Sequence, residues 1–372
     1  MKRTLTLAAL LAAPFALAPY TFADDHQESQ VSASQGRAPQ ENKGHQGHSH
    51  SEHSNSSVAG HVHEAGEWMF TYRHMSMSMS GNLQGSDSIS DDEMATSVTN
   101  RFAGMPGMPP TLRIVPQDME NSMDMLGVMY GFNSRFTVMA MLNYIRKDME
   151  LLTYQGGMGT TELGAFSTES SGFGDLKLAG LWSLIAGENS VVLNVGLSLP
   201  TGSVDEEGAI LSPMNMRPEV RLPYSMQLGS GSYGFEPGLR YSGIAAKWSW
   251  DVELQARIYL NDNAEDYRLG NEESLSGELS YQFTPVFSAS AGLQASHRGS
   301  IDGIDKNIMG PVHTADPDNY GGRFVDFNAG FTAEPVSGHE FDFEYSLPIK
   351  QNVNGVQMEM DSMWSMAYRI TI

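Results

Sequence analysis

The feature that most constrains this chain is a repeated alternation of apolar and polar residues, broken by connections that are alternately short and long. Short connections occur at residues 131–134, 186–189, 244–247, 284–285 and 334–338. Long connections occur at residues 80–121, 150–172, 201–230, 261–271, 299–322 and 351–359. Outer-membrane barrels have this arrangement, with short periplasmic turns and long external loops. Five short and six long connections predict twelve strands, an even number that returns both termini to the periplasm.

The alternation itself distinguishes two faces along each predicted strand. In SVVLNVGLSLP (190–200) one face is wholly apolar and the other is mostly small or polar. In SWDVELQARIYL (249–260) the polar face carries Asp251, Glu253 and Arg257. A soluble sandwich also alternates, but charges lined up along a strand need water, which a wet lumen supplies. The pattern therefore predicts an all-β fold, a transmembrane antiparallel β-barrel of about twelve strands, lined by these three charges.

The N-terminal part divides into two segments before the barrel. Basic residues, an apolar run at residues 5–18 and the small residue Ala23 predict a secretory signal peptide over residues 1–23. Residues 24–66 are polar and His-rich with few large apolar side chains, which predicts a disordered periplasmic leader. The barrel then covers residues 67–372, and secretion followed by a barrel predicts the bacterial outer membrane, with its lipid as a partner.

Several function classes are disfavoured by composition. The formal net charge is -22 and no basic stripe is present, so we expect no nucleic-acid partner. The chain has no cysteine, which excludes disulfides and thiolate metal sites. It has no nucleophile elbow, phosphate loop or HExxH motif. We therefore expect no enzyme and no catalytic residues, and the third possibility, a barrel enzyme, ranks last.

Methionines fall on the polar side of the alternation near both ends of the barrel sequence. In HMSMSMSG (74–81) and the strands that follow, the aromatic and aliphatic residues form the natural lipid face. The methionines predicted to line the lumen are Met75, Met77, Met79, Met123, Met125, Met129, Met139, Met141 and Met363. Such a wall could bind a soft cation such as Cu(I) or Ag(I) through thioethers. It could instead fill an irregular lumen or suit apolar solutes, and this second interpretation is preferred.

Histidines are concentrated in the predicted leader. The candidate metal ligands are His45, His48, His50, His53, His61 and His63. Their spacing suits a flexible chelator of Zn(II) or Cu(II). The alternative is a solvated low-complexity leader with incidental metal affinity. We expect no required cofactor, with Cu or Zn ions as the possible exceptions.

Four stretches resemble a known family. They are MLGVMYGFNSRFTVMAMLNYIRKDM (125–149), GFGDLKLAGLW (172–182), LNVGLSLPTGSV (193–204) and LPYSMQLGSGSY (222–233). These strand and turn motifs are similar to those of the outer-membrane transporter family named for the meta-pathway of phenol degradation. The resemblance covers about residues 120–370 and does not include the His-rich leader. It implies a β-barrel that passes small molecules, without catalytic residues to carry over.

The sequence thus predicts an outer-membrane channel or transporter that passes small solutes, hydrophobic or aromatic ones among them. Lumen charges would set ion preference, and the methionine wall would tolerate apolar or soft solutes. The alternative is a copper- or zinc-binding outer-membrane protein of metal homeostasis. One segment is ambiguous: RLPYSMQLG (221–229) could be a strand, but counting it would break the even number, so we place it in a loop or at the barrel rim.

Overall fold

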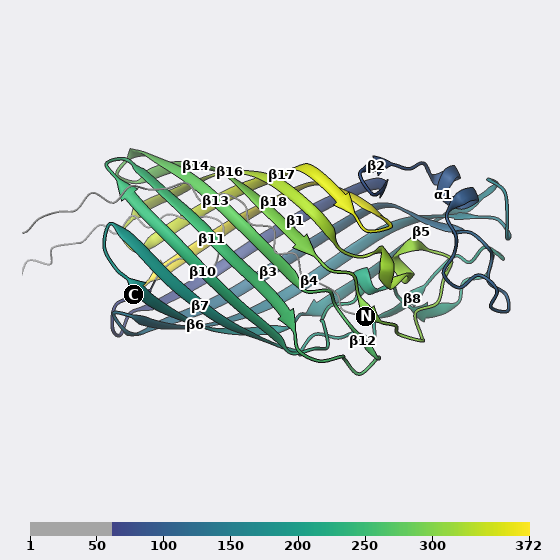
Figure 1. The fold of residues 1–372 in the computed structure, drawn as a ribbon, viewed down its shortest axis with the longest axis horizontal. Coiled ribbons are helices and arrows are strands. Elements are labelled where there is room, and N and C mark those ends of the chain that lie inside the picture. The colour runs from purple at the N-terminus through teal and green to yellow at the C-terminus, as the bar shows by residue number, and fades with distance from the viewer. Residues whose placement is uncertain (1–61) are drawn as a thin grey trace, which may run out of the picture. The chain divides into compact units, whose positions relative to one another are not determined.

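A computed structural model describes residues 62–372, which form one closed antiparallel β-barrel (Figure 1). The last strand pairs with the first and closes the wall, which confirms the predicted fold class. The closed ring has twelve strand positions, and thirteen strands fill them because β5 and β6 share one position. The strands of the wall are β1 (Trp68–Gln84), β3 (Ile114–Asn133), β4 (Phe136–Tyr154), β5 (Glu162–Phe173), β6 (Leu176–Ile185), β7 (Asn189–Leu199), β10 (Gly234–Ala245), β11 (Trp248–Tyr259), β13 (Glu272–Thr284), β14 (Phe287–Arg298), β16 (Gly322–Val336), β17 (His339–Val353) and β18 (Val356–Thr371). The predicted signal peptide and the leader up to residue 61 lie outside the described residues.

Turns of two or three residues join the strands at one end of the barrel, which is the periplasmic end in proteins of this architecture. Longer connections occupy the opposite, external end and carry the remaining elements (Figure 1). These elements are β2 (Asp87–Ser88), α1 (Asp91–Ser97), β8 (Glu207–Ala209), β9 (Glu219–Arg221), η1 (Tyr224–Met226), β12 (Tyr267–Arg268), β15 (Asp302–Gly303), η2 (His313–Ala315) and η3 (Pro317–Asn319). The ambiguous segment at residues 221–229 is not a wall strand, as predicted.

The strands are longer and the external connections shorter than the sequence pattern indicates. β3 has 20 residues and β4 has 19, whereas a strand needs only about 9–11 residues to cross a bilayer. The predicted long connection at residues 351–359 is instead a tight hairpin, because β17 ends at Val353 and β18 begins at Val356. Beyond the lipid the outer face of a strand meets water and its inner face meets the external connections, so these extensions lack the regular alternation that marks a membrane strand.

One position in the wall is shared by two strands. β5 pairs with the external part of β4, and β6 pairs with its periplasmic part. The chain leaves one strand and enters the next through Gly174 and Asp175. Within residues 62–372, β5 pairs with no strand other than β4. The edge of β5 that is not paired with β4 therefore faces the external connections, which fold into the lumen as described below.

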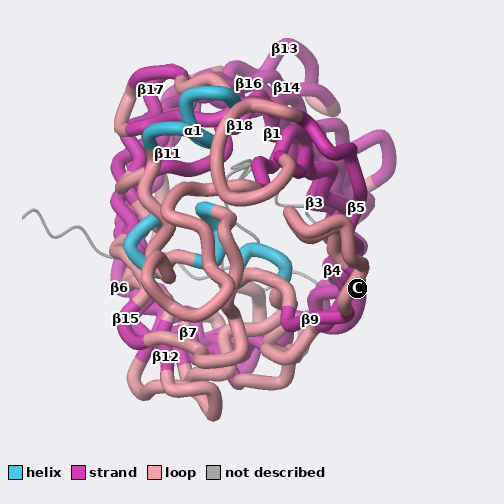
Figure 2. Tube along the Cα trace, turned by 90° about the vertical axis from the view of Figure 1, so that its right-hand side faces the viewer, coloured by secondary structure: helices cyan, strands magenta, loops and turns pink. Residues whose placement is uncertain are grey.

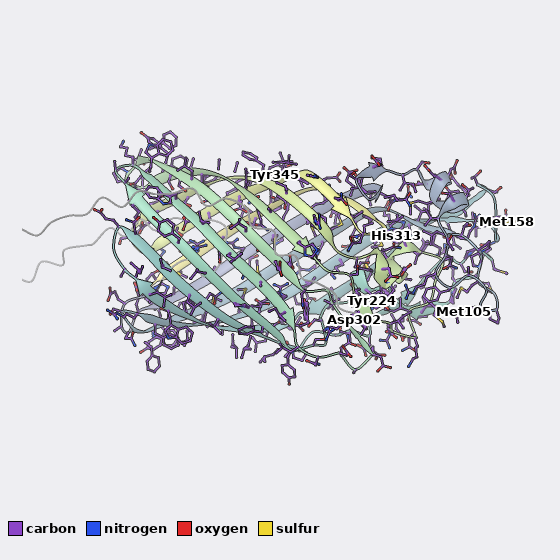
Figure 3. The ribbon with its side chains drawn as sticks, viewed as in Figure 1. Met105, Met158, Tyr224, Asp302, His313 and Tyr345 are labelled. Carbon is purple, nitrogen blue, oxygen red and sulfur yellow. The ribbon has the colours of Figure 1, made fainter. Side chains whose placement is uncertain are left out.

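Exposure separates the two faces of the wall as predicted. In β11, Leu254 is 56% exposed whereas its neighbour Glu253 is 7% exposed. Tyr345 projects from the outer face in the same way (Figure 3). Aromatic rings gather at the periplasmic ends of the strands, as in the contacts Phe136–Trp182 (4.5 Å) and Trp248–Tyr281 (4.7 Å). Such rings form the girdle that anchors a barrel at the lipid interface, and the chain is an outer-membrane protein.

Within the described residues, no helix combines the length and the apolar character that crossing a membrane requires.

Candidate functional site

The lumen face of β1, β3 and β4 is rich in methionine. Met69, Met129 and Met139 are 3%, 2% and 7% exposed. They form one apolar cluster with Met125, Met141, Leu181 and Val192, and Val62, Met75, Met123 and Ala179 pack against it. We call this set the methionine cluster. Of the other methionines predicted to face inward, Met77, Met79 and Met363 are half-buried. The structure thus places the predicted residues on one inner face, while their role in transport stays a prediction.

The inner face from β6 round to β18 is polar, and its charges are joined in ion pairs between strands. These pairs are Lys177–Glu236 (3.3 Å), Arg240–Glu253 (2.9 Å), Arg257–Glu236 (2.7 Å), Arg298–Glu272 (3.0 Å) and Arg369–Asp342 (3.1 Å). The Ser242 hydroxyl also donates a hydrogen bond to Asp251 at 2.5 Å. The charges predicted at positions 251, 253 and 257 therefore lie together, but each is engaged by a neighbouring strand. Ion pairs of this kind give a wet lumen a fixed polar surface opposite the methionine cluster.

External connections fold into the outer end of the barrel. We call the segments 201–233, 260–271 and 299–321 the outer plug, since they lie across the ring of strands when the barrel is seen from this end (Figure 2). The buried apolar residues contributed by the plug are Leu211, Leu222, Tyr224, Met226, Tyr267, Ile301, Ile308, Val312 and Ala315. They pack on wall residues that include Met119, Met149, Leu151, Phe166 and Met358. The plug is therefore a second apolar core inside the barrel.

Tyr224 is one of the buried side chains of this core (Figure 3). Its ring contacts those of Tyr267 and Tyr320 with centroids 4.8 and 5.8 Å away. Its hydroxyl accepts a hydrogen bond from the backbone N–H of Asp305 at 3.0 Å, and burial raises the pKa of Tyr224 to about 12. This one side chain thus holds together three segments of the plug that are far apart in the sequence.

Two wall strands hold the plug by hydrogen bonds from inside the barrel. The ammonium of Lys147 on β4 donates to the carbonyl oxygens of Ser225 and Gln227, each at 2.7 Å. The hydroxyl of Ser170 on β5 donates to the carbonyl oxygen of Met226 at 2.7 Å. A Cβ atom at Gly172 would lie 2.9 Å from a methyl group of Leu228. Glycine at this wall position therefore leaves room for the plug to pack against β5.

Residues 62–67 occupy the periplasmic end of the same lumen. The backbone N–H of His63 donates to the hydroxyl of Thr137 at 2.8 Å, and its Nδ1 lies 3.1 Å from a carboxylate oxygen of Glu67. His63 is 2% exposed, and burial lowers its pKa. A Cβ added to Gly131 would lie 2.0 Å from the carbonyl oxygen of Glu64. His63, predicted as a leader ligand, is thus packed inside the barrel mouth, and His45, His48, His50, His53 and His61 lie outside the described residues.

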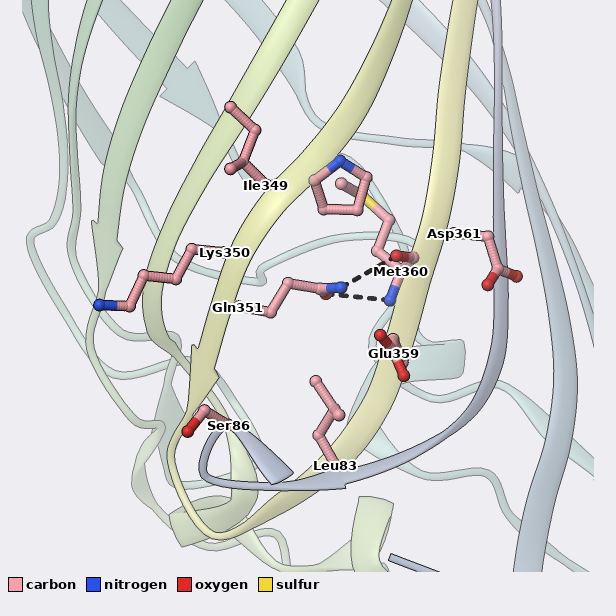
Figure 4. A pocket seen from close by; sticks show the side chains of 9 residues that line it. Leu83, Ser86, Ile349, Lys350, Gln351, Glu359, Met360 and Asp361 are labelled. Atoms are coloured by element: carbon pink, nitrogen blue, oxygen red, sulfur yellow. Dashed lines mark hydrogen bonds between the residues drawn. The ribbon is translucent and has the colours of Figure 1, made fainter. Parts of the chain in front are cut away.

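The wall is not hydrogen-bonded continuously between β17 and β18. Their ladder runs only from the pair His339–Ile370 to the pair Ser346–Met363, although both strands continue beyond it. In the unladdered stretch the side-chain amide of Gln351 donates to the carbonyl oxygen of Met360 at 2.9 Å and accepts from its N–H at 3.0 Å (Figure 4). A cavity of about 440 Å³ opens here. It is lined by Leu83, Ser86, Pro348, Ile349, Lys350, Gln351, Glu359, Met360 and Asp361.

Sequence reasoning did not single out Lys147, Gln351 or Gly131. A lysine on the lumen face of a strand was the one available signal for the plug anchor, since Lys147 has the same parity along β4 as the inward residues Met139 and Met141. Nothing in the local sequence marked Gln351, because its bonding partner Met360 lies on another strand and is identified only from the folded structure. Among residues 62–372 there is no group of three or more His, Cys, Asp or Glu side chains placed to hold a metal ion.

Comparison with known proteins places this geometry among barrels. A family model described as "Putative MetA-pathway of phenol degradation" matches residues 124–336. An outer membrane channel from Pseudomonas putida F1 is similar in structure, with a TM-score of 0.55 and 13% identity over 84% of this chain and 97% of that one. The toluene transporter TbuX of Ralstonia pickettii has a TM-score of 0.46 and 10% identity over 83% and 90% of the two chains. No curated protein matches the sequence.

Proposed function

Because the chain belongs to the family described as "Putative MetA-pathway of phenol degradation", we propose that it carries small apolar or aromatic solutes across the outer membrane. This membership confirms the resemblance that its strand and turn motifs indicated. At the coarser level the chain is an outer-membrane β-barrel of the transporter type. The proposal assigns it passage of solutes and no catalytic step.

One observation carries the choice of solute. The lumen has an apolar wall of methionines opposite a wall of paired charges. Methionine is flexible and polarizable, and its sulfur makes favourable contacts with aromatic rings of about 0.3–1.5 kcal/mol. A planar solute with one polar group would lay its ring on the methionines and turn its polar group toward the charges. The similar transporters named for toluene have TM-scores below 0.5, so they add no weight to this choice.

Liposomes that contain the purified protein are expected to take up a phenol or an aromatic acid faster than protein-free liposomes. Uptake of a neutral sugar of similar size should be slower, because the methionine wall offers it no hydrogen bonds. The measurement is the initial rate of entry of radiolabelled solute, with a heat-unfolded sample as the control. Equal rates for the aromatic solute and the sugar would reject the aromatic preference, and no uptake of either would reject the channel.

The same proposal needs an entry route, because the outer plug fills the external end of the barrel. The unladdered stretch of β17 and β18 offers one, since neither strand has to lose backbone hydrogen bonds there for the two to part. Its cavity of about 440 Å³ lies within the roughly 300–1,000 Å³ usual for small-molecule sites. We infer that solutes enter from the side of the barrel, between these strands, and that Gln351 holds the entrance closed.

Replacing Gln351 by leucine is therefore expected to raise the initial uptake rate about two-fold or more, since a net hydrogen bond contributes only about 0.5–1.5 kcal/mol and two are lost here. Leucine has a similar volume but cannot bridge to the backbone of Met360. Gln282→Leu, near the periplasmic end of β13, is the matched control and should leave the rate unchanged. A rate unaffected by Gln351→Leu would argue against entry at this point.

A second candidate function, copper or zinc homeostasis, is favoured by a different observation. The histidines predicted for it, apart from His63, lie outside the described residues. The methionines, in contrast, lie within the barrel and have sulfur ligands that favour soft ions over zinc.

A further inference from the structure

Methionines on three adjacent strands are confined to one face. On β1, β3 and β4 every methionine points to the lumen side of the wall. These residues are Met69, Met75, Met77, Met79, Met119, Met123, Met125, Met129, Met139, Met141 and Met149. The opposite, lipid-facing side of the same strands uses leucine, valine and aromatic residues for its apolar positions, as at Leu126 and Val138. Leucine and valine supply apolar volume on the lipid side, whereas methionine on the lumen side adds a flexible side chain and a sulfur ligand atom.

Strand register brings three of these side chains into one row. Met69 pairs with Met129 across β1 and β3, and Met129 pairs with Met139 across β3 and β4. Directly opposed residues on one face of a sheet have Cβ atoms about 4.5–5.5 Å apart. All three side chains belong to the methionine cluster and are nearly inaccessible to water. Flexible methionine side chains at this spacing can turn their sulfur atoms toward one common point.

We propose that Met69, Met129 and Met139 form a thioether site for a soft monovalent cation, Cu(I) or Ag(I), inside the periplasmic half of the lumen. Two sulfur ligands of one ion, each bound at about 2.3 Å as in other metal–sulfur sites, lie at most about 4.6 Å apart. Met69 and Met139 are two strand spacings apart, about 9–10 Å, so their sulfur atoms reach this limit only when both side chains turn toward Met129, which the flexible methionine side chain allows. Thioethers are neutral and soft, so they select Cu(I) and Ag(I) and discriminate against Zn(II), Ca²⁺ and Mg²⁺.

The charges around the row allow a bound cation. Lys177 pairs with Met141, two positions along β4 from Met139, but its ammonium lies 3.3 Å from the carboxylate of Glu236. Arg73 is four residues from Met69 on β1 and pairs with Met125, and its charge interacts with the carboxylates of Asp342 and Glu344. Next to the row itself are the neutral side chains of Val62, Ala179 and Leu181. Both ends of the row adjoin neutral residues across the ladder, since Met69 pairs with Thr371 and Met139 pairs with Ala179.

The site also lies where the His-rich sequence joins the barrel. Val62 packs against the methionine cluster, and the backbone of His63 is bound to Thr137, next but one to Met139 on β4. His61 is the residue before Val62 in the sequence. A ligand-rich segment covalently attached beside a site supplies it at a high effective concentration. The proposed cation site is independent of the solute route and does not require aromatic transport.

The test is binding of Ag(I), an air-stable probe of Cu(I) sites, to the purified full chain in detergent. Isothermal titration should show one tight site, and X-ray absorption at the silver edge should show sulfur neighbours. The triple variant Met69→Leu/Met129→Leu/Met139→Leu keeps the apolar volume but removes the sulfur atoms. It is expected to bind at least about 10-fold more weakly, since even the loss of outer-shell partners costs about 10–100-fold.

The matched control is Met149→Leu/Met226→Leu/Met358→Leu, which replaces three methionines that are equally buried in the core of the outer plug. It should bind Ag(I) as the parent chain does. The shift in gel mobility between unheated and heated samples verifies that each variant is folded. Failure of the parent to bind Ag(I), a nitrogen or oxygen shell in the absorption spectrum, or equal loss in both triple variants would each overturn the proposal. None of these results would change the outcome of the solute uptake assay. The cation site and the solute route can therefore be rejected independently of each other.

Discussion

Replacing Lys147 by methionine is expected to raise the population of channels with a displaced outer plug about 100-fold. The variant leaves the carbonyl oxygens of Ser225 and Gln227 without their charged donor. A buried acceptor without a partner costs about 1–3 kcal/mol. Two such oxygens therefore destabilise the seated plug by about 3 kcal/mol or more, and each 1.4 kcal/mol changes an equilibrium about tenfold.

Two measurements report this displacement. Conductance across a planar bilayer should increase, because the plug occupies the external end of the lumen. The chain has no cysteine, so Ser225→Cys introduces a single thiol into the plug, and its reaction with a membrane-impermeant maleimide should accelerate in the Lys147→Met background. Arg146→Met is the control, since Arg146 is the next residue on β4 but points outward and pairs with Asp124. If labelling and conductance are the same in both variants, Lys147 does not hold the plug.

How the plug is held also shows what the sequence can and cannot predict. Twelve of the thirteen wall strands were predictable because each one repeats a two-residue pattern that lipid on one side and water on the other impose. The exception is β5, which lies in the stretch 150–172 that the pattern assigned to a long connection. The direction of the methionines followed from the same pattern, since the lipid face of β3 and β4 is marked by residues such as Leu126 and Val138. These inferences need only the neighbours of a residue along its own strand.

The inward fold of the plug could not be predicted in this way. Leu222, Tyr224 and Met226 are buried, but their partners lie on β4, β5 and two other loops, and no periodicity in the sequence links them. The same limit applies to the row Met69–Met129–Met139, which exists only through the register of three strands. It applies also to Gln351, a polar residue in a stretch that the pattern assigned to a loop. Contacts between distant segments depend on register and closure, which local alternation does not encode.

His313 offers a pH-dependent control of the same plug. It belongs to η2, is 1% exposed, and burial lowers its pKa from 6.5 to about 4 (Figure 3). The carboxylates of Asp316 and Asp318 follow it in the chain, and both are paired with Arg101 at 2.7 Å. Since the seated plug disfavours the protonated imidazole, acid should favour a displaced plug in which His313 reaches water.

Lowering the pH from 6.5 to 4 is therefore expected to destabilise the seated plug by about 3 kcal/mol, because a difference of one pKa unit corresponds to about 1.36 kcal/mol. Above pH 6.5 the imidazole is neutral in both states, so stability should not change there through this group. Conductance should rise across this window. The maleimide labelling rate of Ser225→Cys, divided by that of a free thiol at the same pH, should rise by up to about 100-fold; the ratio is needed because acid lowers the fraction of reactive thiolate. In His313→Leu, whose side chain cannot be protonated, this rise should disappear. The control is His297→Leu, at an exposed position at the external end of β14, which should behave like the parent chain. If His313→Leu instead shows the same acid response as the parent chain, burial of the His313 imidazole does not control the plug.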